Sequence, residues 1–179
     1  MDFIFVTSNK NKLREVEEIL ERKVRHSSLE IPEIQSLDGV DVIKDKAVKA
    51  YEILKEPVVV EDTSLHIKVL NGFPGALVKW VLLNCGVERM CKLVRKGEDR
   101  SAYAEVHICL YDGKKFRFFA GRTNGSIAQS PRGQTGFGWD VLFIPEGYTK
   151  TYSQMDSELK NKISHRGKAF RKFKKFLEE

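Results

Sequence analysis

The 179-residue sequence lacks several features that would place it in a large class of proteins. No stretch approaches the ~18 consecutive apolar residues that a membrane-spanning helix needs. The first six residues lead directly into a polar segment, so the pattern of a secretory signal peptide is missing. There are three cysteines, none of them in a CxxC pair, which is too few for a disulfide framework. These absences favour a protein without a membrane segment in a reducing, cytoplasmic setting.

The familiar nucleotide-binding and hydrolase motifs are missing as well. Neither GxxxxGK[ST] nor a GxGxxG after a strand occurs, so a P-loop or a Rossmann site has no support. No GxSxG elbow is present, and the adjacent Ser164 and His165 cannot adopt the geometry of a Ser-His-acid triad. The formal net charge of +6 arises entirely within residues 160–179, since basic and acidic side chains balance in the remainder. Such a basic end can attract phosphate-bearing ligands or form a solvated helix face.

The chain alternates strand-like and helix-like patterns without an internal repeat or a long linker. With 41% hydrophobic residues over a length typical of one domain, it can bury a core of its own. Short apolar, β-rich runs predict strands at residues 2–7, 57–61, 65–70, 101–111, 114–122 and 140–144. Apolar residues at helical spacing predict helices at 9–23, 42–54, 76–84, 87–96 and at the C-terminus, where Phe170, Phe173, Phe176 and Leu177 form one stripe. We therefore expect a single α/β domain over residues 1–179, built on a mixed sheet.

The segment Thr7-Ser8-Asn9-Lys10-Asn11-Lys12 lies where the first predicted strand passes into a helix. A helix N-terminus presents unpaired backbone N–H groups and a partial positive charge, so it binds anions readily. Ser8 and Asn9 can donate from their side chains, and Lys12 lies one turn inside the helix, within reach of a phosphate. The alternative is an ordinary N-cap followed by surface lysines, which many helix starts show.

Two adjacent acids follow the apolar run 58–60, within the segment 61–64 (EDTS). Carboxylates at the end of a buried strand are costly unless something positive faces them. A divalent metal would satisfy them, and Mg²⁺ prefers one or two carboxylates together with phosphate oxygens. Asp62 or Glu61 could instead accept a proton from an attacking water, and a strand end emerging into solvent is a third alternative. Glu33, in a non-helical stretch, is a candidate for a second ligand.

Phe137-Gly138-Trp139-Asp140 places two aromatic rings beside a glycine and an acid. Aromatic faces stack on nucleobases at about 1–3 kcal/mol per base, although a core aromatic cluster at a turn would leave the same pattern. Ser164-His165-Arg166, with Lys160 six residues before Arg166, could donate to a carbonyl or a phosphate, or form only a helix cap. Together, a phosphate-binding turn, an acidic site, an aromatic slot and a cationic strip predict a nucleotide site.

These motifs occur in the order typical of the inosine triphosphate pyrophosphatase family, which the sequence resembles over nearly its whole length. The resemblance is carried by Thr7-Ser8-Asn9-Lys10-Asn11-Lys12, Val60-Glu61-Asp62-Thr63, Gly72-Phe73-Pro74-Gly75, Phe137-Gly138-Trp139-Asp140 and Ser164-His165-Arg166. Five ordered motifs are far more specific than any one of them. That family hydrolyses non-standard purine nucleoside triphosphates.

The resemblance implies an α/β fold in which two lobes on a long twisted mixed sheet enclose a cleft. It implies hydrolysis of ITP, dITP or XTP to the monophosphate and pyrophosphate, with Mg²⁺ as cofactor. Glu33 and Asp62 would be the metal ligands, with Asp62 also the catalytic proton acceptor and Lys12 the principal catalytic cation. The substrate-binding residues implied by position are Thr7, Ser8, Asn9, Lys10, Asn11, Lys12, Lys46, Thr63, Phe137, Gly138, Trp139, Asp140, Lys160, His165 and Arg166.

Purine discrimination is expected at the edge of the base. Hypoxanthine and xanthine carry an acceptor oxygen at position 6, where adenine carries an amino donor, so a donor such as Arg166 favours ITP over ATP. GTP shares this oxygen, so its exclusion requires a contact at position 2. The sequence departs from the commonest family pattern at Ser8, where Gly is frequent, and at residues 61–64, where Asp-Asp-Ser-Gly is frequent. The departure at residues 61–64, together with Trp139-Asp140, marks a subgroup and leaves the role of Asp62 intact. The departure at Ser8 bears on how closely the backbone can approach a phosphate.

Family analogy and the apolar helices around Trp80 predict a homodimer with no nucleic-acid partner and no membrane partner. One alternative is a septum-formation-type pyrophosphatase of similar fold that acts on pyrimidine or modified nucleotides. Another is a nucleic-acid-binding module that uses the basic C-terminus, for which binding to oligonucleotides would depend steeply on salt.

Overall fold

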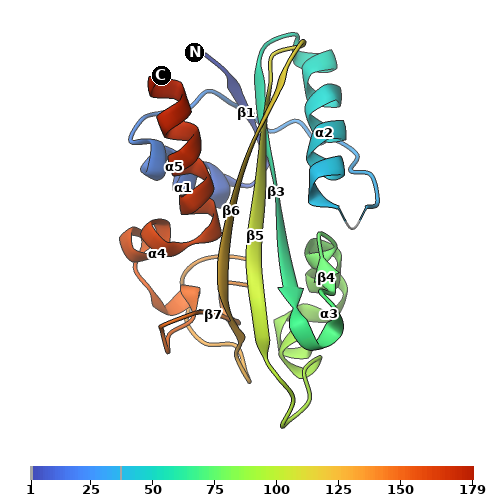
Figure 1. Cartoon of the computed structure of the whole chain (residues 1–179), viewed down its shortest axis with the longest axis vertical. Helices are drawn as coiled ribbons and strands as arrows, with labels where there is room; N and C mark the ends of the chain where they lie inside the picture. Colours follow the sequence, from blue (N-terminus) through green and yellow to red (C-terminus); the bar gives the residue numbers. More distant parts are fainter. Residues whose placement is uncertain (1, 37) are drawn as a thin grey trace.

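A long twisted sheet forms the spine of the molecule (Figure 1). The computed structural model describes residues 2–36 and 38–179. Within these ranges the sheet has seven strands: β1 (Ile4–Val6), β2 (His26–Ser27), β3 (Val58–Ile67), β4 (Pro74–Gly75), β5 (Ser101–Tyr111), β6 (Phe116–Ile127) and β7 (Phe143–Pro145). The strand order is β2-β1-β3-β5-β6-β7, with β4 paired to β3. β1 is parallel to β2 and β3 while the other pairs are antiparallel, which confirms the expected mixed sheet.

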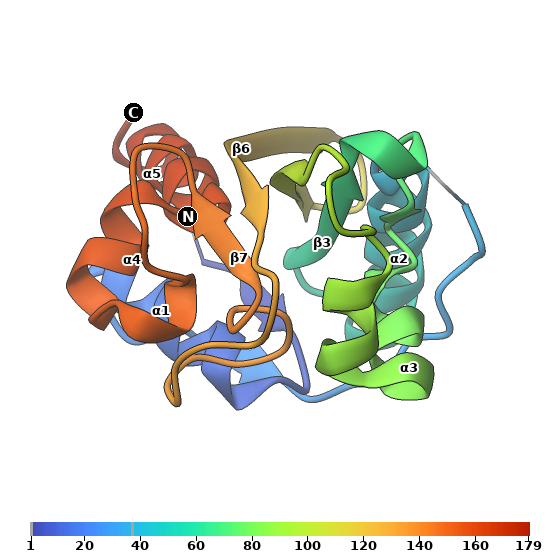
Figure 2. The ribbon, with the colours of Figure 1, turned by 90° about the horizontal axis from the view of Figure 1, so that it is seen from below.

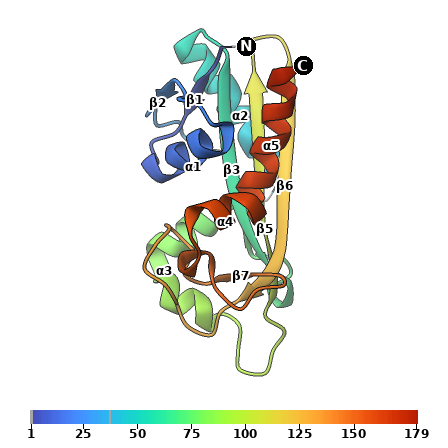
Figure 3. The ribbon, with the colours of Figure 1, turned by 90° about the vertical axis from the view of Figure 1, so that its left-hand side faces the viewer.

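Helices cover the sheet on more than one side (Figures 1 and 3). The helices of the described chain are α1 (Lys10–Leu20), α2 (Gly39–Leu54), α3 (Val78–Lys92), α4 (Ser157–Ile163) and α5 (His165–Glu178). Figure 3 shows α1 and α5 beside the upper part of the long strands, and α3 and α4 towards the lower part. None of these described helices combines the length and the apolar character needed to cross a membrane.

The alternation of side chains along β3 decides which core each residue joins. Val58 and Val60 pack under α2, in a cluster that includes Ile43. Val59 points to the opposite face and packs in the cluster of α1 and α5, which contains Phe170. A third cluster fills the lower part of the molecule, between α3, the ends of β3 and β5, and the segment 139–155. The sheet is thus buried on both faces near α2 and on one face below it.

Two predicted strands, at 57–61 and 65–70, are one continuous strand, β3. The polar residues Thr63 and Ser64 interrupt the apolar pattern, but the backbone pairs with β5 residue by residue from Val58 to Ile67. Residues 68–70 form a 3₁₀ turn instead of strand. The separation predicted from the sequence was therefore wrong, because backbone pairing does not depend on whether a side chain is apolar.

The predicted hairpin is confirmed, with its second strand longer than expected. β6 continues past residue 122 to Ile127, where β7 pairs with it. Gly121 permits α5 to pack closely on β6, because a Cβ at this position would lie 2.1 Å from the carbonyl oxygen of His165 on α5. The strand predicted at 140–144 begins only at Phe143, because residues 138–142 form turns.

Helix boundaries follow local capping. Asn9 caps α1, accepting from the backbone N–H groups of Asn11 and Lys12. Asp38 caps α2, which begins at Gly39, three residues before the predicted start. The predicted break near Gly86 is confirmed as a non-helical residue (φ 75°, ψ 166°) within α3. The amphipathic C-terminal helix is also confirmed, whereas β2 and α4 were not predicted because both are short.

Candidate active site

A cleft of about 810 Å³ lies between α1, α2, α3 and the loop 137–140. Figure 2, seen from below, places α1, α4 and α5 on one side and α2 and α3 on the other. The lining comes from segments that are far apart in the sequence: Val6–Asn9, Leu29–Glu33, Asp62–Thr63, residues 76–83, Phe137–Asp140 and His165–Arg166, with Lys12 and Lys46. The cleft therefore brings together all four of the predicted site features.

The turn from β1 into α1 forms one wall. Asn9 uses its side-chain oxygen as the N-cap, at 2.9 Å from the Asn11 nitrogen and 3.2 Å from the Lys12 nitrogen. Thr7 Oγ1 accepts from the Asn9 N–H at 3.2 Å. These bonds fix the turn, so that the positive end of the α1 dipole and the Lys12 ammonium lie at the same wall. Such a wall is suited to an anion.

The two adjacent acids of β3 point to opposite faces of the sheet, so they have different environments. Glu61 is buried and accepts from Arg166 Nε at 3.0 Å and Nη2 at 2.9 Å, while Lys12 Nζ lies 3.0 Å from its Oε1. Burial alone would raise the pKa of Glu61, but Arg166 and Lys12 bring it far below its ordinary value. Asp62 instead lines the cleft. The choice between these two acids, open in the sequence, favours Asp62.

Asp62 is an unsatisfied carboxylate. Its Oδ2 atom is buried and finds no hydrogen-bond partner in the described part of the chain. Burial raises the pKa of Asp62 to about 6, against the opposing influence of Lys12 and Lys46. A buried anionic oxygen without a donor is unfavourable unless a cation or a proton completes it.

Glu33 lies on the same cleft and is held by Lys46 of α2, with Nζ to Oε1 at 2.8 Å. Burial raises its pKa, but Lys46, Lys79 and Lys12 together lower it below the ordinary value, so Glu33 is ionised at neutral pH. Across residues 2–36 and 38–179, no group of three acidic, His or Cys side chains forms a closed metal site. Two carboxylates at an open cleft nevertheless fit Mg²⁺, which takes its remaining ligands from phosphates and water.

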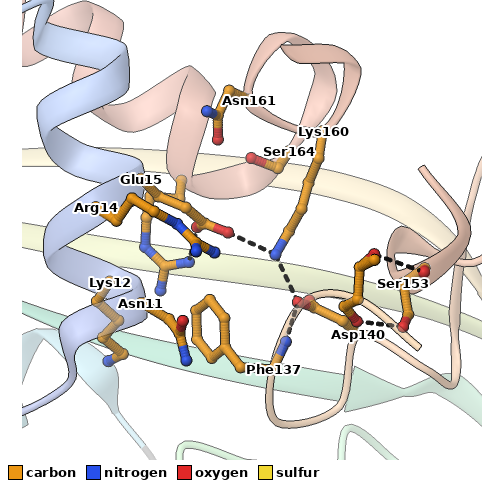
Figure 4. A network of polar contacts seen from close by, with 12 residues as sticks. Asn11, Lys12, Arg14, Glu15, Phe137, Asp140, Ser153, Lys160, Asn161 and Ser164 are labelled. Carbon is orange, nitrogen blue, oxygen red and sulfur yellow. Dashed lines mark hydrogen bonds and ion pairs between the residues drawn. The ribbon is translucent and has the colours of Figure 1, made fainter. Parts of the chain in front are cut away.

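Glu15 of α1 binds two cations that were predicted as substrate contacts, Lys160 and Arg166; Figure 4 shows its contact with Lys160. Its Oε1 accepts from Lys160 Nζ at 2.6 Å and its Oε2 from Arg166 Nη1 at 2.7 Å. All three side chains are buried. Together with the bonds from Arg166 to Glu61 and to Thr63 Oγ1, four of the five N–H donors of the guanidinium are engaged within the protein.

Lys160 connects this network to the aromatic loop, residues 137–140. Its Nζ lies 2.5 Å from Asp140 Oδ2, which also accepts from the Phe137 backbone N–H at 2.8 Å (Figure 4). The ammonium lies 4.7 Å from the centre of the Phe137 ring and the Arg166 guanidinium 5.6 Å from it. Lys160 and Asp140 thus fix the loop that carries Phe137 into the cleft lining, with two cations beside its ring.

His165 and Trp139 form the inner end of the cleft. Their rings stack at 5.2 Å between centres, and both side chains are buried although they line the cleft. Neither ring nitrogen of His165 has a hydrogen-bond partner within the described residues. Burial, followed by the neighbouring Arg166 and Lys160, lowers the pKa of His165 well below its ordinary value, so the ring is neutral. A neutral imidazole can donate from one nitrogen and accept at the other.

The structure places most of the predicted site residues on the cleft wall. Among the described residues, the predicted ones that do not line it are Lys10, Asn11 and Lys160. Lys10 is exposed on the first turn of α1, and Lys160 is buried behind the aromatic loop by its two ion pairs. Lys10, Asn11 and Lys160 would contact a bound substrate only if their side chains moved into the cleft. Otherwise they would affect binding only through the lining residues next to them.

Several lining or supporting residues were missed in the sequence. Lys79, Trp80 and Leu83 of α3 line the cleft, and Trp80 is 51% exposed there. The apolar surface around Trp80, from which an interface was predicted, therefore belongs at least in part to the cleft. Glu15 could have been found, since it stands four residues before Ile19 on the apolar face of α1, where a charged residue is unusual.

The fold and the cleft define an α/β protein whose site combines cations, an unsatisfied carboxylate and aromatic rings. The chain belongs to the Ham1 family, whose model matches residues 3–176. It is 38% identical to a dITP/XTP pyrophosphatase of Hyperthermus butylicus, over 98% of this chain and 94% of the relative. It is 40% identical to an inosine triphosphate pyrophosphatase of Saccharomyces cerevisiae, over 98% of this chain and 95% of the relative. A HAM1 protein from Coxiella burnetii superposes with a TM-score of 0.85 at 28% identity, covering 99% and 98% of the two chains.

Proposed function

We propose that this protein hydrolyses non-standard purine nucleoside triphosphates, namely ITP, dITP and XTP, to the monophosphate and pyrophosphate. The names of its relatives, inosine triphosphate pyrophosphatase and dITP/XTP pyrophosphatase, support this activity. The observation that carries the proposal is the cleft itself, in which a cationic helix start, an unsatisfied Asp62 carboxylate and an aromatic loop face the same space. A triphosphate with a planar base has the charge and the shape to fill such a cleft.

The phosphates would bind at the Thr7–Asn9 turn and between Lys12 and Lys46. Lys12 is 22% exposed and paired with Glu61, and Lys46 is 15% exposed and paired with Glu33, so both ammonium groups are held at the cleft wall before substrate arrives. Fixed cations of this kind stabilise charge that develops on a departing pyrophosphate without reorganising.

We propose Mg²⁺ as the cofactor, held by Asp62 and Glu33. The donor set fits, because the buried Oδ2 of Asp62 lacks a partner among the described residues and hard oxygen ligands suit this ion. When bound, the ion would neutralise the triphosphate charge and orient the phosphorus for in-line attack.

Asp62 is also proposed as the acceptor of the proton that the attacking water loses. In the metal-free protein the pKa of the Asp62 carboxyl is raised to about 6, so it is a stronger base than an ordinary aspartate and is still ionised at neutral pH; a bound cation would lower this pKa. Glu61 is unsuited to this role, since Arg166 and Lys12 occupy its carboxylate.

The base would stack on Phe137 and reach Trp139, with its edge towards His165 and Arg166. His165 has free ring nitrogens for the base edge, whereas Arg166 has at most one N–H left after its bonds to Glu15, Glu61 and Thr63. Arg166 therefore supplies a single donor to the oxygen at position 6, and this is enough to disfavour the amino group of adenine at the same place.

A substrate panel tests the proposal. ITP, dITP, XTP, GTP, ATP, dTTP and UTP are each incubated with the protein and Mg²⁺, and pyrophosphate and orthophosphate release are scored separately. We expect pyrophosphate from ITP, dITP and XTP, at least tenfold faster than from GTP or ATP. Preference for dTTP or UTP would instead indicate a pyrophosphatase of the septum-formation type, and orthophosphate release would overturn the reaction. The variant Asp62→Asn, purified in parallel, controls for contaminating phosphatases.

We further propose that the protein is a cytoplasmic homodimer. The free cysteines, of which Cys91 and Cys109 are buried, are consistent with a reducing compartment. Light scattering coupled to size-exclusion chromatography tests the dimer, since a mass of 20.5 kDa would identify a monomer.

A further inference from the structure

Asp62 has a direct neighbour on the next strand that none of the assigned roles includes. His107 of β5 is its register partner in the antiparallel β3–β5 pair, so both side chains point to the same face of the sheet. The His107 side chain is 19% exposed, and it does not belong to the cleft lining. It therefore lies behind Asp62 as seen from the substrate space.

The first turn of α2 closes over this pair because residue 39 is glycine. A Cβ at position 39 would lie 2.9 Å from Nδ1 of His107 and 3.9 Å from Oδ2 of Asp62. The backbone of Gly39 is in the ordinary helical region, so space rather than φ accounts for the glycine. Gly39, His107 and Asp62 are thus packed with no room for one further methyl group.

The opposite side of the His107 ring is also bounded. Its Nε2 lies 3.9 Å from Oε2 of Glu105, and Oε1 of Glu105 accepts from Arg122 Nε at 3.1 Å. Arg122 in turn lies over the Tyr103 ring at 4.0 Å. The ring is thus bounded by Gly39 of α2 on one side and by Glu105, with Arg122 behind it, on the other.

We propose that His107 is a positioning residue for Asp62: its ring, confined by Gly39 and Glu105, fixes the direction in which the Asp62 carboxylate is presented to the cleft. The carboxylate has an Oδ2 atom without a hydrogen-bond partner in the described chain, so packing must supply the orientation that hydrogen bonds supply in other sites. α2 also carries Lys46, which pairs with Glu33. The contact of Gly39 of α2 with His107 therefore also sets the position of Glu33 relative to Asp62, the other proposed metal ligand. The inference rests on the proposed function of the cleft.

The first test removes the ring. We expect His107→Ala to lower kcat for ITP about 10- to 100-fold and to raise the Mg²⁺ concentration for half-maximal activity, while KM for ITP at saturating Mg²⁺ changes less than about twofold. Binding of Mn²⁺ to the nucleotide-free protein, measured by electron paramagnetic resonance, should weaken in parallel, which gives a readout independent of turnover. His107→Gln, which restores much of the volume, should recover most of both losses.

His66→Ala is the matched control. His66 lies on β3 and stacks on Tyr103 of the same sheet face, away from Asp62. Its removal should leave kcat, KM and Mn²⁺ binding within about twofold of the wild type, whatever it does to thermal stability. Equal losses in the two histidine variants would mean that His107 acts only through overall stability and would overturn the proposal.

The second test uses Gly39. Gly39→Ala should displace the His107 ring and lower kcat and Mn²⁺ affinity in the same way, whereas the double variant Gly39→Ala/His107→Ala should be no worse than His107→Ala alone, because the clash is gone. If the fold-losses in kcat and Mn²⁺ affinity of the two single variants multiply in the double variant, the two residues act separately. If the wild-type protein releases no pyrophosphate from any nucleotide, the proposed function fails. If the wild type is active and His107→Ala has normal kcat and Mn²⁺ binding, the inference alone fails.

Discussion

Asp62 carries a carboxylate whose protonation is coupled to folding. Its pKa is raised from the ordinary value of 3.8 to about 6, with burial as the main cause. The folded state therefore binds the Asp62 proton more tightly than the unfolded chain. The stability that this provides is present below pH 3.8 and is lost as the pH rises through 6.

We expect Asp62→Asn to abolish hydrolysis of ITP and, in the metal-free protein, to raise the free energy of unfolding, because no anion is buried. The gain should be about 3 kcal/mol at pH 7.5 and about half of that at pH 5. Urea unfolding in the presence of EDTA at both pH values measures the difference. An equal gain at pH 5 and pH 7.5 would show that the Asp62 carboxylate is not the group responsible.

Glu15 is a buried acid whose ionised form stabilises the fold, in contrast to Asp62. It is the shared anion of Lys160 and Arg166, and burial of either cation without it is costly. Glu15→Gln should lower the free energy of unfolding by about 3–5 kcal/mol. Glu21→Gln is the control, because Glu21 is 77% exposed in its pair with Lys174 and its loss should cost less than about 1 kcal/mol. Thermal denaturation of both variants decides whether burial of the ion pair is the cause.

The basic C-terminal helix explains why a cluster of positive charge need not be a binding surface. Six of the eight basic side chains of residues 160–179 have partners within the protein. Lys160 and Arg166 bind carboxylates inside the protein, Lys174 binds Glu21, and the others donate to main-chain carbonyls: Lys168, Arg171 and Lys172. These contacts support the proposal that the charge is structural rather than a nucleic-acid site.

Two of these contacts protect the edge of β6. Lys168 Nζ lies 2.9 Å from the carbonyl oxygen of Arg122, and Lys172 Nζ lies 2.7 Å from that of Ala120. Residues four apart on a helix rise ~6 Å, close to the ~6.7 Å between residues two apart on a strand, so the two elements are in register. The lysines thereby occupy outward carbonyls to which another strand could bind.

The double variant Lys168→Met/Lys172→Met keeps the aliphatic stems and removes the ammonium groups. We expect it to lose about 1 kcal/mol of stability per carbonyl contact and to self-associate at high concentration through the β6 edge. Dynamic light scattering across a concentration series measures the association. Lys175→Met, on the same helix, is the control and should self-associate no more than the wild type. If it aggregates as the double variant does, the loss of positive charge alone is the cause.

The strands and helices differ in how well their own residues predict them. α5 was predicted correctly because its apolar stripe, Phe170 and Phe173 above all, is a local pattern. The continuity of β3 was not predicted. Thr63 and Ser64 are typical of a strand end, and only their pairing with β5 shows that the strand continues through them. A short helix such as α4 has too few residues to show a period.

Across the protein as a whole, the cleft is assembled from distant segments, so a ligand should leave a divided footprint. With a non-hydrolysable ITP analogue and Mg²⁺, hydrogen exchange should slow in residues 7–12, 76–83 and 137–140 together, since all three contribute lining. The turn at residues 112–115, between β5 and β6, is the internal control. Protection limited to residues 7–12 would show that the aromatic loop does not meet the ligand.

The sequence largely predicted which residues form the candidate site, but not which of them face the cleft and which are buried in ion pairs. Thr7, Lys12, Asp62 and Phe137 stand in motifs whose residue types indicate their chemistry, and the structure places them on one cleft. That Lys160 is buried against Glu15, from which it is separated by 145 positions in the chain, depends on the packing of α4 against α1. No local pattern reports a contact over such a separation.

The amino-acid sequence alone determined the family, the alternation of strands and helices and the identity of the chemical groups, because motifs and periodicity are properties of neighbouring residues. The three-dimensional arrangement decided which of two adjacent acids faces the cleft. It also decided which cations reach the cleft, as Lys12 and Lys46 do, and which are buried in ion pairs behind it, as Lys160 is. The reason is that β3 gives successive side chains to opposite faces: Asp62 faces the cleft beside α2, whereas Glu61 is buried on the face of α1 and α5 against Arg166 and Lys12.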